Sequence, residues 1–229
     1  MAPARQLSIA VDGGHSVSAL LQVPPQARAC FVFGHGAGAG MQHVFMTAVA
    51  MELEARDIAT LRYQFPYMER RSRRPDPPAL CHATVRAAVA EASRQLPGVS
   101  LVAGGKSFGG RMTSQAQASS PLAGVHGLAF LGFPLHLTGK PSTERAAHLQ
   151  QVAIPMLFLQ GTRDELADRA LLDPVISALG ARAEVRWFED ADHSFHVPAK
   201  SGKNDRQALI EVVTALAQWM TSVVSRASN

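Results

Sequence analysis

Cysteine, aromatic side chains and charge are all scarce in this sequence. Its 229 residues include only two cysteines, Cys30 and Cys81, whereas small secreted scaffolds depend on several disulfides. We therefore expect both to be reduced thiols. Charged residues make up 17% of the chain and hydrophobic residues 47%, which excludes a disordered chain and allows a core that needs no disulfide or metal to fold.

Long apolar runs and targeting signals are missing as well. No stretch approaches the roughly 18 unbroken apolar residues of a membrane span, and the first six residues, MAPARQ, lack the apolar core and cleavage site of a secretory leader. No linker, repeat or low-complexity tract divides the chain. We expect a single domain over residues 1–229, located in the cytoplasm and without a membrane partner. The sequence leaves the oligomeric state open.

The net charge of +4 raises the question of a nucleic-acid partner. The only dense basic run is ERRSRR at residues 69–74, and no aromatic residue interrupts it, so a solvated loop is favoured over a phosphate-binding patch. We expect no nucleic-acid partner. A second hypothesis stays open, in which the cluster from Arg70 to Arg74 attracts an acidic substrate such as an acyl-CoA.

Short β-rich runs alternate with helical patterns, which predicts an α/β protein. The first two runs, residues 7–11 and 17–22, flank the turn signal Asp12-Gly13-Gly14 and should form an antiparallel hairpin. Six further strands are expected to complete a mostly parallel eight-stranded sheet with helices on both faces. These strands cover residues 29–33, 58–63, 99–103, 125–131, 154–160 and 183–188, with helices at about 43–55, 79–96, directly after Ser107, and 205–224.

A separate lid domain is not expected. Roughly twenty residues separate the strands at 125–131 and 154–160, which is too few for such an insertion. The site should therefore be open and shallow.

The pentapeptide Gly105-Lys106-Ser107-Phe108-Gly109 fits G-x-S-x-G between a predicted strand and a predicted helix. Small residues around the serine permit a strained turn that lifts its Oγ clear of the sheet and leaves nearby backbone N–H groups free. Taken alone, the motif fits equally well a glycine-rich turn that caps a helix.

Two partners for a nucleophilic Ser107 follow in the order Asp, His, each after a late strand. Asp164 stands after the strand at 154–160, and His193 stands after the strand at 183–188. A serine hydroxyl is a weak nucleophile at neutral pH, so His193 would take its proton and Asp164 would hold the imidazole in the required tautomer. Activity should then fall below about pH 6.5, where a free imidazole becomes protonated.

Asp164 has rivals for this role. Glu165 and Asp168 are close by in the chain, and Asp192 is next to the histidine, although neighbours in an extended loop generally point apart. Asp164 also fits the N-cap of a helical turn at residues 165–169. The order of the three partners is what favours the catalytic interpretation.

A second glycine-rich loop, GHGAGAG at residues 34–40, follows the third strand. Its small residues let the backbone approach a ligand, and we expect the N–H of Ala37 to join that of Phe108 as an oxyanion hole. A dinucleotide cradle is the alternative. It fails because His43 stands where G-x-G-x-x-G needs its third glycine, and because no acidic residue ends the next strand.

Five further residues are candidates for the substrate pocket. Tyr63 ends one predicted strand and Phe65 follows it, and Phe133 and His136 follow another strand, although the aromatic residues among them fit a cover over the core equally well. His35 is the fifth candidate, and anchoring of the glycine-rich loop is its alternative role.

Together, the strand–turn–helix motif at residues 105–109 (the elbow), the order of the partners of Ser107 and the glycine-rich loop resemble the α/β-hydrolase fold over essentially the whole chain. A closer resemblance is to a family of small bacterial α/β-hydrolase-like proteins related to an animal testis-expressed protein and to a subunit of the NSL histone-acetyltransferase complex. It is carried by FGHGAGAGM at 33–41, RYQFPY at 62–67, GGKSFGGRM at 104–112, LGFPLH at 131–136, GTRD at 161–164 and ADHSF at 191–195. The resemblance implies a hydrolase without an agreed substrate.

We therefore expect a serine hydrolase that cleaves a small-molecule carboxylic ester or thioester through an acyl-enzyme on Ser107. The alternative is a catalytically silent module of the same fold that binds or scaffolds a partner. No metal or cofactor is expected, because no carboxylate or cysteine completes a ligand set with His193 and His196.

Overall fold

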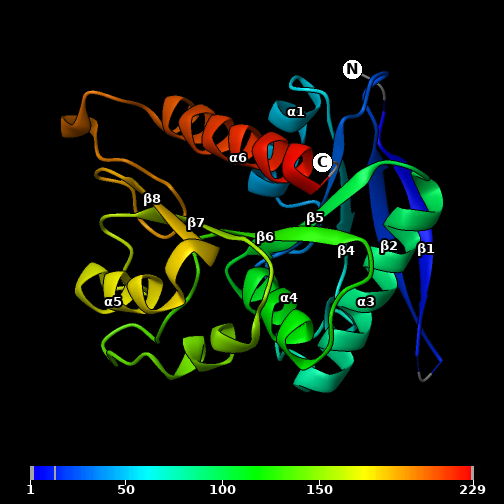
Figure 1. Cartoon of the computed structure of the whole chain (residues 1–229), viewed down its shortest axis with the longest axis horizontal. Coiled ribbons are helices and arrows are strands. Elements are labelled where there is room, and N and C mark those ends of the chain that lie inside the picture. Colours follow the sequence, from blue (N-terminus) through cyan, green and yellow to red (C-terminus); the bar gives the residue numbers. More distant parts are fainter. Residues whose placement is uncertain (1–2, 13, 228–229) are drawn as a thin grey trace.

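The structure, a computed structural model that describes residues 3–12 and 14–227, is built on one eight-stranded sheet (Figure 1). The spatial order of the strands is β1-β2-β4-β3-β5-β6-β7-β8. β1 and β2 form an antiparallel hairpin, β2 pairs antiparallel with β4, and all other pairs are parallel. The strands are β1 Arg5–Val11, β2 His15–Gln22, β3 Ala29–Gly34, β4 Ile58–Tyr63, β5 Ser100–Lys106, β6 Val125–Leu131, β7 Met156–Gly161 and β8 Ala183–Phe188.

Helices cover both faces of the sheet. α1 and α6 lie on one face, and α3, α4 and α5 lie on the other (Figure 1). The α-helices are α1 Val44–Glu54, α2 Pro66–Glu69, α3 Pro78–Gln95, α4 Phe108–Ser119, α5 Arg169–Leu179 and α6 Asp205–Ala227, with short 3-10 helices η1 Glu144–Gln151, η2 Gly180–Arg182 and η3 Ala199–Ser201.

The central strands are buried on both faces, which explains their unbroken apolar sequences. Every residue of β3, β4 and β7 is buried. Alternate side chains of β3 enter different cores: Phe31 and Phe33 pack with α1 and α6, whereas Cys30 and Val32 pack with the layer that contains α3 and α4. The sheet thus separates two cores, one beneath each helical layer.

Most of the expected elements are present. All eight strands and the mostly parallel sheet with its N-terminal hairpin are confirmed, and Cys30 and Cys81 are free thiols, as expected. The turn between β1 and β2 includes Gly13, which lies outside the described residues. Two helices were not anticipated, α2 and α5; Pro174 lies inside α5, and a proline within a short run is usually a signal of helix termination.

Helix α6 is long and apolar enough to cross a membrane by length and composition. The apolar stripe of this helix packs on the sheet, because Val212, Val213, Leu216 and Met220 are fully buried against it. One face of α6 therefore belongs to the core beneath it.

The connections out of β3 and β5 diverge. The chain leaves β3 toward α1 on one face and leaves β5 toward α4 on the other. Such a switch point opens a crevice at the carboxyl ends of the strands, which is where sites form in sheets of this type.

Candidate active site

Ser107 occupies the sharp turn between β5 and α4. Its backbone has φ 49° and ψ −112°, a conformation that costs a non-glycine residue of order 1–3 kcal/mol. The turn needs α4 to approach β3 closely: a Cβ on Gly109 would lie 2.4 Å from the carbonyl carbon and oxygen of Gly34. The glycine of the motif therefore permits the approach, and the strain is concentrated at the serine.

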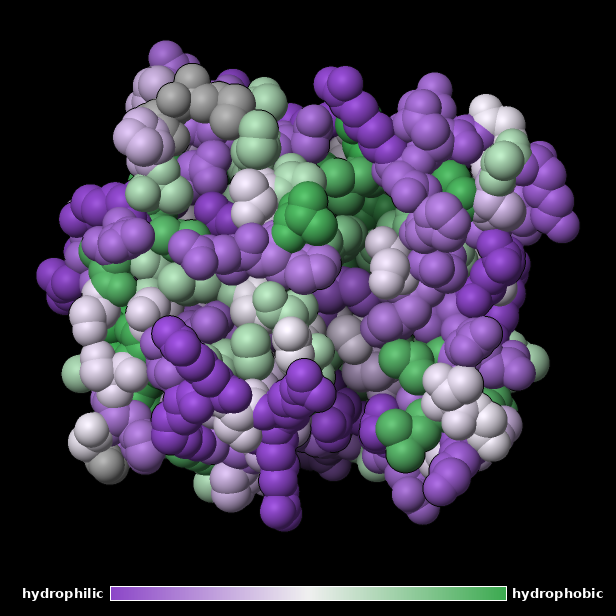
Figure 2. Space-filling view, turned by 180° about the vertical axis from the view of Figure 1, so that it is seen from behind, coloured by the Kyte–Doolittle hydropathy of each residue, from purple (hydrophilic) through white to green (hydrophobic). Residues whose placement is uncertain are grey.

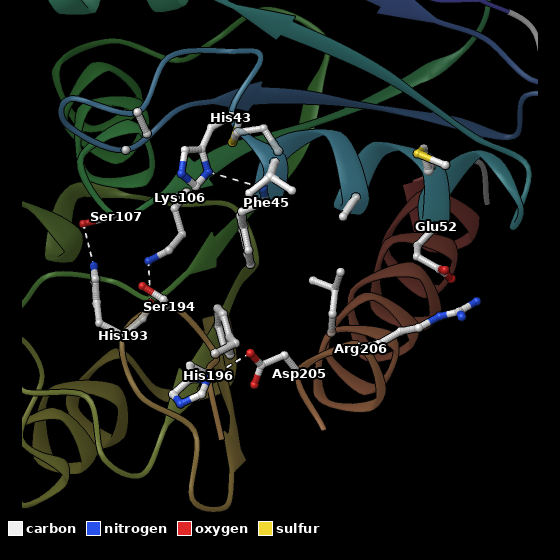
Figure 3. A pocket seen from close by; sticks show the side chains of 18 of the residues that line it. His43, Phe45, Glu52, Lys106, Ser107, His193, Ser194, His196, Asp205 and Arg206 are labelled. Atoms are coloured by element: carbon white, nitrogen blue, oxygen red, sulfur yellow. Dashed lines mark hydrogen bonds and ion pairs between the residues drawn. The ribbon is translucent and has the colours of Figure 1, made fainter. Parts of the chain in front are cut away.

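Ser107, His193 and Asp164 are joined by two hydrogen bonds. Ser107 Oγ lies 2.9 Å from His193 Nε2, and His193 Nδ1 lies 2.7 Å from Asp164 Oδ2; Figure 3 shows the first of these contacts at one end of the pocket. The carboxylate is acceptor only, so it selects the tautomer with the proton on Nδ1 and leaves Nε2 to accept from the serine hydroxyl. The sequence-predicted residues thus meet in the order that proton transfer needs.

Asp164 is held by more than the histidine. Its side chain is fully buried, Oδ1 accepts the N–H of Leu166 at 2.8 Å, and Oδ2 also accepts the side-chain amide of Gln160. These donors satisfy the buried charge and fix the direction in which the carboxylate points.

The rival carboxylates have other roles. Asp168 caps α5, since its side chain accepts the N–H of Ala170 at 2.8 Å. Asp164 itself also caps the turn that follows it, because its Oδ1 accepts the N–H of Leu166, so the alternative role and the contact with His193 are both present. Asp192 accepts the N–H groups of Ser194 and His196 and so shapes the loop that carries His193.

Lys106 connects the elbow to the histidine loop. Its Nζ donates to the backbone carbonyl of His193 at 2.7 Å, and burial lowers the pKa of this lysine to about 8, although Asp164 and Asp192 favour its charged form. Gly132, with φ +71°, leaves room for both partners. A Cβ there would lie 2.9 Å from Lys106 Nζ and 3.2 Å from His193 Cε1.

Two backbone N–H groups near Ser107 are available for a ligand. Phe108 begins α4, where first-turn N–H groups have no helical acceptor, and Ala37 borders the same cleft as Ser107. Within the described residues, no hydrogen bond uses the N–H of either one. These are the donors that the sequence predicted for an oxyanion.

The cleft at Ser107 has a volume of about 1000 Å³, at the upper end of the range for small-molecule sites. It lies between α1, the loop after β8 and the first turn of α6 (Figure 3). The side chains that line it are mainly apolar, and include Val44, Phe45, Met51, Phe195 and Leu209.

The five residues that the sequence suggested for the substrate pocket do not line the cleft, which corrects that prediction. None of Tyr63, Phe65, Phe133, His35 and His136 borders the cleft; the first four are fully buried and His136 is nearly so. The three aromatic residues cover the core instead, which was the alternative interpretation.

The two buried histidines are structural. His35 Nε2 accepts the N–H of Phe65 at 3.1 Å, its Nδ1 lies 2.8 Å from the carbonyl of Gly36, and burial lowers its pKa to about 4. His136 Nε2 accepts the N–H of Asp168. Each therefore fixes a loop beside the site.

The basic cluster from Arg70 to Arg74 lies outside the cleft, whereas His196 borders it. No residue from Arg70 to Arg74 lines the cleft, and Arg70 forms an ion pair with Asp76. His196, considered with His193 as a metal pair, lies 2.9 Å from Asp205 through Nδ1.

Sequence reasoning missed Lys106, Gln160 and the apolar wall of the cleft. Gln160 carried a signal, since it is a polar residue at the end of an otherwise apolar strand. Lys106 is part of the elbow motif itself. Its partner is the backbone carbonyl of His193, and a backbone group cannot be identified as a partner from the residue types in the sequence.

The chain is similar in sequence to one domain family and in structure to several solved proteins. The profile of the alpha/beta hydrolase domain matches residues 27–221. An alpha-beta serine hydrolase homologue from Coxiella burnetii has a TM-score of 0.75 at 18% identity, over 95% of this chain and 98% of the other. The esterase domain of a Rhodothermus marinus protein has a TM-score of 0.74 at 16% identity, over 96% of this chain and 99% of the other. A serine hydrolase without a lid from Xanthomonas campestris has a TM-score of 0.70 at 20% identity, over 96% of both chains.

Proposed function

The chain belongs to the alpha/beta hydrolase domain family, and on that premise we propose that it is a serine hydrolase that cleaves a carboxylic ester or thioester through an acyl-enzyme on Ser107. The names of the structural relatives, an esterase domain and two serine hydrolases, support hydrolase chemistry. Included in the proposal are the narrower kinship with the testis-expressed and NSL-complex proteins, a single domain over residues 1–229 and a cytoplasmic location, all of which stay predictions from the sequence.

The observation that carries the proposal is the pair of hydrogen bonds from Ser107 to His193 and from His193 to Asp164. In the first step Ser107 Oγ attacks the carbonyl carbon of the substrate while His193 Nε2 accepts the hydroxyl proton. The carbonyl electrons move onto oxygen, and the N–H groups of Ala37 and Phe108 stabilise that charge. Asp164 stabilises the imidazolium without taking its proton.

Collapse of this intermediate re-forms the carbonyl and breaks the bond to the alcohol or thiol. The leaving oxygen or sulfur takes the proton from His193, so the enzyme now carries an ester on Ser107. Water then attacks the acyl-enzyme with His193 again as base. The products are the free acid and a regenerated serine, and the proton transfers use side chains of this chain alone.

The test is the variant Ser107→Ala, assayed with p-nitrophenyl acetate. We expect its rate to fall by several orders of magnitude, since removal of the nucleophile leaves only a residual enhancement over the rate in buffer. Ser120→Ala is the matched control because Ser120 is exposed at the end of α4, and it should turn over like the wild type. Equal rates for Ser107→Ala and the wild type would end the assignment.

A fluorophosphonate separates the enzyme from a silent binding module of the same fold. The wild type and Ser120→Ala should become labelled, and Ser107→Ala should not. A wild-type protein that neither hydrolyses esters nor reacts with the probe would be the silent module instead.

A further inference from the structure

Exposed aliphatic side chains lie along the cleft beside Ser107. Among the described residues, the large hydrophobic side chains classed as exposed are Val44 at 75%, Leu137 at 52% and Met51 at 41%, and two of these three, Val44 and Met51, border the cleft. Figure 2 shows one face of the molecule, on whose upper part hydrophobic residues lie in a hollow with hydrophilic residues around it. Exposed apolar surface rimmed by polar residues is typical of a binding site.

One face of α1 forms a wall of the cleft. Val44, Ala48 and Met51 follow one another at helical spacing and all border the cleft. Leu209, on α6, borders it from the other helix. Apolar side chains therefore line the cleft from two elements.

An aromatic pair adds to the lining. The rings of Phe45 and Phe195 stack with their centroids 6.0 Å apart and their planes 8° from parallel. Phe45 projects into the middle of the pocket in Figure 3. Since Phe195 lies two residues after His193, this surface begins beside the catalytic loop.

The cleft has a catalytic end and a charged end. Ser107 and His193 lie at one end in Figure 3, and Glu52 and Arg206 lie at the other. Glu52 is paired with Arg56 at 2.8 Å. Between these ends the wall of α1 is apolar, and the paired side chains of His196 and Asp205, 2.9 Å apart, border the cleft on the side across from it.

We propose that this cleft binds an extended aliphatic arm of the ester or thioester substrate, about eight to ten carbons long. The inference rests on the proposed function for the position of the reacting carbonyl at Ser107. From Val44 to Met51 the helix rises about 10 Å, at roughly 1.5 Å per residue. An extended chain advances a little over 1 Å per carbon–carbon bond of about 1.5 Å, so about eight carbons span the wall before the arm reaches Glu52 and Arg206.

The arm is either the acyl chain or the alkyl chain of the alcohol. Both are chains of methylene groups, so both would make the same apolar contacts with the wall of α1. Each methylene that leaves water should raise kcat/KM about two- to fourfold, the upper value being that of complete burial. The gain should stop once the arm reaches the charged end of the cleft. A purely short-chain esterase would show no such series.

The experiment compares two substrate series with the wild-type protein. One series is p-nitrophenyl esters from acetate to dodecanoate, and the other is alkyl acetates from ethyl to dodecyl. We expect kcat/KM to rise at least about 50-fold between two and eight carbons in one series and to level off near ten. The series that rises identifies the acyl or the alcohol side as the arm.

Three variants test the wall. Val44→Asp and Met51→Lys place charge on it, and each charge suits its end of the α1 dipole, so the helix should remain folded. Both should lower the ratio of octanoate to acetate turnover about tenfold or more. Ala48→Phe should narrow the cleft and shift the preferred chain to fewer carbons. Leu137→Lys is the matched control, because Leu137 is similarly exposed but does not border the cleft, and its ratio should equal that of the wild type.

Calorimetry of p-nitrophenyl octanoate binding to Ser107→Ala keeps this test independent of turnover. Binding that Val44→Asp weakens supports the arm even if the wild type hydrolyses nothing, which would remove the proposed function alone. Hydrolysis of acetate with a flat chain-length series would overturn the arm and leave the function standing. A wild-type dimer that Val44→Asp dissociates, again with a flat series, would assign this face to a second copy of the chain.

Discussion

Lys106 Nζ donates a 2.7 Å hydrogen bond to the backbone carbonyl of His193. The residue beside the candidate nucleophile therefore holds the loop of its candidate base. The bond joins the end of β5, in the middle of the sheet, to the loop after β8, at its edge. It is charge-assisted while the ammonium is protonated, and such bonds are roughly twice as strong as neutral ones.

Loss of this bond should slow catalysis without abolishing substrate binding. We expect Lys106→Met to lower kcat about 10- to 100-fold, because small displacements of a catalytic group cost that much, with KM for p-nitrophenyl acetate changed less than threefold. Steady-state kinetics measures both. An unchanged kcat would mean that the loop keeps its position without Lys106.

The pH profile distinguishes positioning from general stability. Burial lowers the pKa of Lys106 to about 8, so the ammonium is present below that pH and lost above it. We expect kcat to fall on the alkaline side with a midpoint near pH 8. In Lys106→Arg the guanidinium stays charged, and this limb should disappear even if the maximal rate is lower. The same limb in both proteins would contradict the role of Lys106.

Gly132 is expected to tolerate no side chain. In Gly132→Ala the methyl would meet both Lys106 Nζ and His193 Cε1 at close to 3 Å and would sit at a positive φ. We expect kcat to fall about 10-fold or more while the protein remains folded. Gly124→Ala is the control: it also has positive φ, but open space surrounds its Cβ position, so it should lose stability and keep its kcat.

The strained backbone at Ser107 should lower the free energy of unfolding relative to a glycine at the same position. Glycine adopts φ 49° without a Cβ penalty, so Ser107→Gly should be inactive yet more stable by about 1 kcal/mol, the relief of strain exceeding the entropy that glycine adds. A rise in Tm of about 2–4 °C is expected for a domain of this size. Ser120→Gly, at φ −167°, should lower Tm instead. If both variants lower Tm, the elbow stores no strain.

Acid should destabilise the fold through His35. Burial lowers its pKa to about 4, against about 6.5 in an unfolded chain, so between these values the unfolded state binds more protons. The free energy of unfolding should be unaffected above pH 6.5 and should fall by up to about 3 kcal/mol as the pH drops to 4. Urea midpoints measure this. His35→Gln should start lower at pH 7 and lose less on acidification; a parallel loss would exclude His35 as the cause.

The strands were predictable because their signals are local. Residues 58–63, 125–131 and 183–188 coincide with β4, β6 and β8, since apolar runs bounded by turn residues need no tertiary information. α5 was missed because Pro174 breaks its pattern. The order of Ser107, Asp164 and His193 was also readable, because each follows a strand that the sequence already predicts.

The pocket was not predictable in the same way. The ring of Phe133 packs against those of Phe130 and Phe158, and nothing in its own sequence separates that core position from a cleft position. Val44 and Met51 read as ordinary helix residues, since only the placement of α1 beside α6 leaves their face open. The direction of a side chain at the end of a strand and the gap between two helices depend on the tertiary structure, so local sequence patterns do not predict them.

The edge position of β8 has a consequence for heating. This strand pairs only with β7 and has no buried residue, so it should open at lower cost than the central strands. The base, His193, follows this strand, whereas Ser107 follows a central one. Warming should therefore abolish activity reversibly at temperatures where circular dichroism still reports a folded protein. The hydrogen bond from Lys106 to the carbonyl of His193 should raise the temperature at which this loss occurs.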